Sequence, residues 1–143
     1  MAQIVGFNLK KILIERKEEL KKGFEIKYDL GIKNIEKTKL EISKDKDVLS
    51  LEFKFIIQYT PNIAIIEFEG NVLLLAEPKE VREILKEWKK KHISDKIRLL
   101  VFNLIIIKCS IKALELEDNL NLPYHVPVPR LTPAQQRERT YTG

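Results

Sequence analysis

Residues 47–77, DVLSLEFKFIIQYTPNIAIIEFEGNVLLLAE, hold two long runs in which apolar and polar side chains alternate. In the first run every second residue from 49 to 59 is apolar, and in the second the apolar residues fall on even positions from 64 to 74. A period of two is typical of antiparallel strands with one buried face. Because residues 60–62 are turn formers, the sequence predicts a long β-hairpin with Gly70 as a candidate bulge.

Two more strands are expected on the N-terminal side of the hairpin. Residues 24–32 alternate in the same way, and residues 38–43 extend this strand after a change of phase near Ile35. Residues 4–16 fit either a helix or a bent strand, and we assign them to a strand. The sheet is therefore expected to contain four antiparallel strands.

After the hairpin the apolar period changes to that of helices. A short amphipathic helix beginning near Pro78 is indicated by four residues at i, i+3, i+4 and i+7: Val81, Ile84, Leu85 and Trp88. Ser94 or Asp95 can cap a second, longer helix that ends near residues 119–121, before Pro123. The predicted fold class is α+β, a four-stranded antiparallel sheet with a short and a long C-terminal helix packed on one face.

The long helix is apolar on almost every side, so nearly all of its surface must be buried against other parts of the protein. Periodicity does not distinguish a helix buried within one chain from a helix shared between subunits. We expect a homo-oligomer, a dimer or a tetramer, whose interface includes five residues of this helix: Leu100, Phe102, Leu104, Ile107 and Ile111.

Length and composition indicate one soluble globular domain. The chain has 143 residues and a net charge of +5, with acidic and basic residues interspersed, which favours solubility over nucleic-acid binding. A single cysteine excludes an internal disulfide framework. Residues 1–131 are expected to form the domain, and residues 132–143 a flexible tail. Abundant Lys, Glu and Ile suggest a thermophilic source.

The groups that catalysis requires are sparse in this sequence. His92 and His125 are read as lone surface histidines, and Cys109 as a packing residue on the apolar helix. No glycine-rich phosphate loop is present. We therefore expect no catalytic residues, no metal and no cofactor. Without a secretory signal or a stretch long enough to span a bilayer, the protein is expected to be cytoplasmic, with no membrane insertion.

The order of elements resembles that of the SecB family of protein-export chaperones. The resemblance covers residues 3–131 and rests on that order, on the hairpin, and on the LNLP sequence at residues 120–123. It implies an ATP-independent holdase that binds unfolded polypeptides in a hydrophobic groove and assembles as a tetramer. Sheet positions that are acidic in the bacterial export chaperones here mix Lys and Glu, which favours a stand-alone holdase or a chaperone of a toxin–antitoxin partner.

Six residues are candidates for contact with an unfolded client: Phe53, Phe55, Tyr59, Trp88, Leu122 and Tyr124. Ordinary core packing competes with this role, most strongly for Phe53 and Phe55. Replacing Tyr59 and Tyr124 with Ala is expected to weaken client binding without unfolding the protein. The alternatives are a nucleic-acid-binding module that uses the Lys-rich short helix, and a small-molecule-binding domain.

Overall fold

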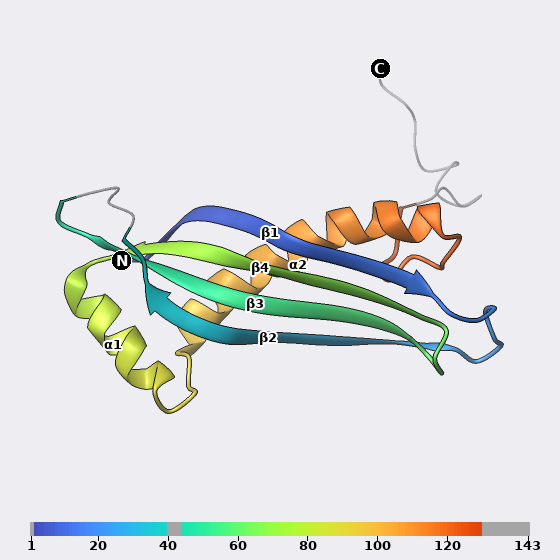
Figure 1. Cartoon of the computed structure of the whole chain (residues 1–143), viewed down its shortest axis with the longest axis horizontal. Coiled ribbons are helices and arrows are strands. Elements are labelled where there is room, and N and C mark those ends of the chain that lie inside the picture. The colour runs from blue at the N-terminus through green and yellow to red at the C-terminus, as the bar shows by residue number, and fades with distance from the viewer. Residues whose placement is uncertain (1, 40–43, 130–143) are drawn as a thin grey trace, which may run out of the picture.

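The computed structural model describes residues 2–39 and 44–129. Four strands precede two helices along the chain: β1 (Gln3–Arg16), β2 (Glu25–Lys37), β3 (Asp47–Thr60), β4 (Ala64–Ala76), α1 (Pro78–Trp88) and α2 (Asp95–Asn119). The strands form one sheet; α2 runs along it, and α1 lies at one end (Figure 1). The α+β fold class predicted from the sequence is confirmed.

The sheet is antiparallel throughout and has the strand order β1-β4-β3-β2. The predicted hairpin of β3 and β4 forms its centre, with Val48 opposite Leu75 and Tyr59 opposite Ala64. β1 and β2 are the edge strands, so the ambiguous residues 4–16 are a strand as assigned.

One face of the sheet builds the core together with α2. The alternating residues of β3 and β4, among them Phe53 and Phe68, are fully buried. α2 adds one buried residue in every four, which places a single stripe against this inner face: Ile97, Val101, Ile105, Cys109 and Ala113. The opposite, outer face carries polar side chains such as Lys54 and Glu69. The inner face of the sheet and the buried stripe of α2 therefore hold the molecule together.

The irregularity expected at Gly70 lies on the neighbouring strand. The register of β1 against β4 shifts between Leu9 and Lys11, directly opposite Gly70. A Cβ atom at Gly70 would lie 2.0 Å from the backbone oxygen of Asn8. Gly70 thus leaves the space into which the bulged backbone of β1 packs.

The phase change expected near Ile35 occurs earlier in β2. The register against β3 shifts between Ile32 and Asn34, because Lys33 is an extra residue there and its Nζ reaches Glu69 at 3.2 Å. β2 ends at Lys37, so it does not continue into the predicted extension, of which residues 40–43 lie outside the described part.

Both helices begin and end close to the expected positions. α1 begins at Pro78; α2 begins at Asp95 after Ser94, whose side chain makes no capping hydrogen bond, and it ends at Asn119. Within the described ranges no helix is both long and apolar enough to cross a membrane. The expected tail, residues 132–143, falls outside the described residues.

Candidate functional site

After α2 the chain turns back across the inner face of the sheet. We call residues 120–129 the return segment. Its backbone is held by polar side chains of the sheet: Arg16 donates to the carbonyl oxygen of Leu120 at 2.8 Å, and the Tyr28 hydroxyl donates to that of His125 at 2.6 Å. The Tyr59 hydroxyl donates to the carbonyl oxygen of Pro123. Three strands therefore hold this irregular segment in place.

A second set of contacts ties the return segment to α2 through His125. Its backbone N–H donates to Oε1 of Glu117 at 3.0 Å, and its Nδ1 lies 2.6 Å from Oε2. Its Nε2 lies 3.1 Å from Oγ of Ser110. An ionised Glu117 only accepts hydrogen bonds, and Nδ1 is the donor to it in the tautomer that carries a proton there.

The interpretation of His125 as a lone surface histidine was wrong. Its side chain is buried and lies against a fully buried carboxylate from the preceding helix. The two residues are only eight positions apart in sequence. The turn after Asn119 brings them together, and neither residue shows a metal-ligand or helical spacing that would have revealed the contact.

Ser110, His125 and Glu117 share the connectivity of a serine–histidine–carboxylate triad. Ser110 lies inside α2, where backbone N–H groups bond to carbonyl groups of the same helix. Such a position offers no free pair of N–H groups to stabilise an oxyanion. The three side chains are therefore best described as the anchor of the return segment.

The two tyrosines that contact the return segment remain hydrogen-bond donors. Burial raises the pKa of Tyr59 well above its usual range, and the nearby Glu117 adds to the increase. Burial also raises the pKa of Tyr28. Both phenols therefore keep their protons at neutral pH and can donate to any backbone carbonyl group placed before them.

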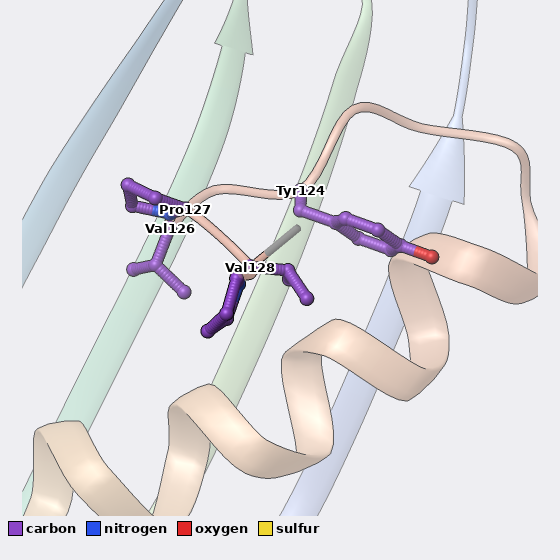
Figure 2. A pocket seen from close by; sticks show the side chains of 5 residues that line it. Tyr124, Val126, Pro127 and Val128 are labelled. Atoms are coloured by element: carbon purple, nitrogen blue, oxygen red, sulfur yellow. The ribbon is translucent and has the colours of Figure 1, made fainter. Parts of the chain in front are cut away.

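The exposed half of the return segment lines a shallow hollow of about 510 Å³. Its lining is mainly apolar: Tyr124, Val126, Pro127, Val128 and Pro129. Figure 2 shows the labelled side chains on a stretch of chain that lies over the strands beside α2 and turns back at Pro127 toward Val128. Tyr124 is 45% exposed, and its hydroxyl donates to Asp118 at 3.0 Å.

The side of α2 that faces away from the sheet is also apolar. Five large aliphatic residues are exposed there, with Leu99 at 63% and Ile111 at 66%: Leu99, Leu100, Ile106, Ile107 and Ile111. Near the start of α2 a second hollow, of about 320 Å³, is lined by Asp95, Arg98, Leu99 and Phe102. Large exposed apolar patches are common at the interaction sites of proteins.

Of the six residues predicted to contact a client, Tyr59 is brought next to Leu122 and Tyr124 through its bond to Pro123, but the six do not form one exposed surface. Phe53, Phe55, Tyr59 and Leu122 are buried in the core, and Trp88 is partly buried with Lys91 Nζ 4.5 Å from its ring centre. Only Tyr124 is exposed. The expectation that Ala at position 59 leaves the fold intact meets a physical obstacle, because removing a buried aromatic ring typically costs about 3–5 kcal/mol.

The predicted interface residues divide into two groups. Leu100, Ile107 and Ile111 are exposed, whereas Phe102 and Leu104 are partly buried and pack against the core. Leu99 and Ile106 belong to the same exposed side but were not selected from the sequence. Leu99 and Ile106 are seven residues apart, about two helical turns, and this spacing could have identified them from the sequence as residues on one side of the helix.

The remaining reactive groups take structural positions. Cys109 is buried between α2 and the sheet, and burial raises the pKa of its thiol to about 12. His92 is exposed, as predicted. Among the described residues no group of three or more His, Cys, Asp or Glu side chains is placed to hold a metal ion.

Comparison with known proteins identifies the fold. No protein-family model matches the chain, and neither does any curated protein. It is similar to a solved structure of the Mycobacterium tuberculosis Rv1957 SecB-like chaperone in complex with a ChAD peptide from the Rv1956 HigA1 antitoxin. The TM-score is 0.54 at 17% sequence identity, over 92% of this chain and 90% of that chain. The chain therefore has the SecB-like fold, and the resemblance drawn from the sequence is confirmed at this level.

Proposed function

We propose that this protein is an ATP-independent holdase that binds non-native polypeptides through an apolar surface. The observation that carries the proposal is the exposed aliphatic surface of α2 on a SecB-like fold. The similar structure is named a chaperone and contains a bound peptide, which supports the same class of partner for this chain. Binding of this kind needs no bond-breaking group, so the proposal includes no enzymatic activity. A cytoplasmic location is part of it.

The client surface that we propose extends along α2, from the hollow that Leu99 and Phe102 line to the hollow lined by Tyr124. Tyr124 offers an exposed aromatic ring, and the valines and prolines beside it add apolar area without a charge. Trp88 is the last residue of α1 and precedes α2, whereas Tyr124 follows α2. The 25 residues of α2, at about 1.5 Å per residue, therefore separate Trp88 widely from Tyr124. A long unfolded chain can reach both positions; a small ligand cannot.

We also propose that a second copy of the chain covers Leu100, Ile107 and Ile111. These residues follow one another at seven and four positions, so they share a helical face. Their exposure in a single chain leaves aliphatic surface in water, and an identical helix supplies the complementary apolar face. The oligomer then holds two or more client surfaces on one particle.

The test is suppression of aggregation of guanidinium-denatured citrate synthase, without ATP, beside a light-scattering mass determination. We expect the wild-type protein to be an oligomer and to suppress the aggregation of citrate synthase. A matched pair of variants is Leu99→Ala and Leu20→Ala, because both shorten one exposed leucine and only Leu99 lines a hollow on α2. Weaker suppression is expected for the first variant alone. Absence of suppression by the wild-type protein would contradict the proposal.

A further inference from the structure

Two residues that contact the return segment lie on one narrow strip of α2 together with two exposed aliphatic residues. Leu99, Ile106, Ser110 and Glu117 follow one another at seven, four and seven residues. With about 3.6 residues per turn, these steps are close to whole turns, so the four side chains point in nearly the same direction. The return segment covers the Ser110 and Glu117 end of the strip, whereas Leu99 and Ile106 are exposed.

The first half of the return segment runs antiparallel to α2 along this strip, and the chain then bends at His125 and Val126. Tyr124 bonds to Asp118, and the next residue, His125, bonds to Glu117 and then to Ser110. Toward the N-terminal end of α2, the strip continues past Ile106 to Leu99, which lines a hollow together with Phe102. The return segment therefore covers the polar end of a longer track on α2 and leaves the apolar end open.

Most contacts that hold the return segment use backbone groups. The hydroxyls of Tyr59 and Tyr28 donate to the carbonyl groups of residues 123 and 125, two positions apart. Any extended polypeptide presents carbonyl groups on one side at this interval. Leu122 adds one buried apolar side chain, and His125 is the sequence-specific contact.

We propose that this track is the groove for an extended, apolar client segment, and that the return segment is an internal competitor that the client displaces. The groove consists of the strip on α2 with Tyr28 and Tyr59. The inference deepens the proposed holdase function and rests on it. It defines the client as an extended stretch with apolar side chains whose carbonyl groups accept from the two phenols. The His125 contacts with Glu117 and Ser110 then set how much of the groove is open.

The first measurement uses the wild-type chain, so it does not depend on a variant that folds poorly. The backbone N–H groups of Leu122 and His125 donate to residue 117, and they are expected to be protected from hydrogen exchange in the free protein. Saturation with carboxymethylated α-lactalbumin, which stays unfolded, should speed their exchange. Amides in the centre of β3 should keep their protection. Unchanged exchange at residues 122–126 under saturating client would overturn the proposal.

The second measurement compares client affinity between variants. His125→Ala removes the sequence-specific contacts of the return segment; if that segment fills nine-tenths of the grooves, its release lowers the Kd for carboxymethylated α-lactalbumin about tenfold. Gly70→Ala is the control for loss of stability, because its added Cβ atom meets the backbone of Asn8 and it changes no residue of the return segment, so it should not tighten binding. A synthetic peptide with the sequence of residues 121–129 should compete with the client.

The outcomes separate the two proposals. Suppression of aggregation by the wild-type protein, with no tighter binding by His125→Ala and no competition by the peptide, would overturn the internal-competitor proposal and leave the holdase proposal standing. If the wild-type protein and the His125→Ala variant both fail to bind the unfolded client, both proposals fail. Tighter binding by His125→Ala together with faster exchange at residues 122–126 supports both.

Discussion

Nδ1 of His125 lies 2.6 Å from Oε2 of Glu117, and both side chains are shielded from solvent. Glu117 belongs to the last turn of α2, whereas His125 belongs to the return segment. A carboxylate in such a place is costly unless hydrogen bonds compensate it. The pair therefore supplies both the partner that Glu117 needs and the contact that fixes the return segment.

Removal of the His125 ring should destabilise the protein strongly. In the His125→Ala variant Glu117 loses its imidazole partner, and breaking one side of a buried pair costs about 3–5 kcal/mol. Urea unfolding followed by circular dichroism measures the difference. His92→Ala, a change at an exposed histidine, should stay within about 0.5 kcal/mol of wild type. Equal stabilities for the two variants would show that the buried pair contributes little.

Gly70 should not tolerate a methyl group. The Cβ atom of Gly70→Ala would lie 2.0 Å from the backbone oxygen of Asn8, so β1 must move away from β4. Forcing an atom into a packed site costs about 1–3 kcal/mol, and a backbone contact this short places the variant at the upper end. Gly31→Ala is the control, since nothing lies within 4 Å of its added Cβ atom. Similar unfolding midpoints for the two variants would contradict this account.

Protonation of the ion-paired Glu67 carboxylate should lower the unfolding free energy of the protein in acid. A hydrogen bond from Lys11, at 2.7 Å, and a second from Lys54, at 3.3 Å, hold the pKa of the Glu67 carboxyl below its ordinary value of 4.5. The unfolded chain therefore binds a proton more readily than the folded one. The resulting stability is fully present above pH 4.5 and is lost as the pH falls through the lower pKa of the folded state.

The measurement is the unfolding free energy of wild type and Glu67→Gln as a function of pH. The wild-type protein should be the more stable of the two at pH values above about 5.5, and the difference should shrink as the pH falls below 4.5 through the lower pKa of the folded state. Glu36→Gln, an exposed change on the same face of the sheet, should follow the wild-type curve throughout. A constant difference between wild type and Glu67→Gln across this range would exclude the mechanism.

The fold could be predicted from the sequence because its elements have clear periods. β3 and β4 alternate over many residues, and α1 shows a four-residue helical stripe, so their type and order followed from side-chain spacing. The bulge was placed on the wrong strand for a physical reason. Gly70 marks a close approach of another backbone, and a sequence does not show which strand approaches.

The candidate site was harder to predict because it depends on a turn and on burial. Tyr59 falls on the inner face of β3 like its apolar neighbours, yet its hydroxyl bonds to a segment 64 positions away. His125 gave no signal, because its partners Glu117 and Ser110 become adjacent only after the chain reverses beyond α2. Proline content did indicate an extended segment, but not the surface on which it lies.

The exposed side of α2 should determine the mass of the particle. Ile107→Glu combined with Ile111→Glu places two charges on the face that we propose to be covered by a second copy, and burying unpaired charges in an interface is unfavourable. The double variant should therefore have the mass of one chain in light scattering, with an unchanged circular dichroism spectrum because both residues are exposed. Lys108→Glu, an exposed change between them, should keep the oligomer. A wild-type protein with the mass of one chain, or an oligomer that survives both substitutions, would rule out this interface.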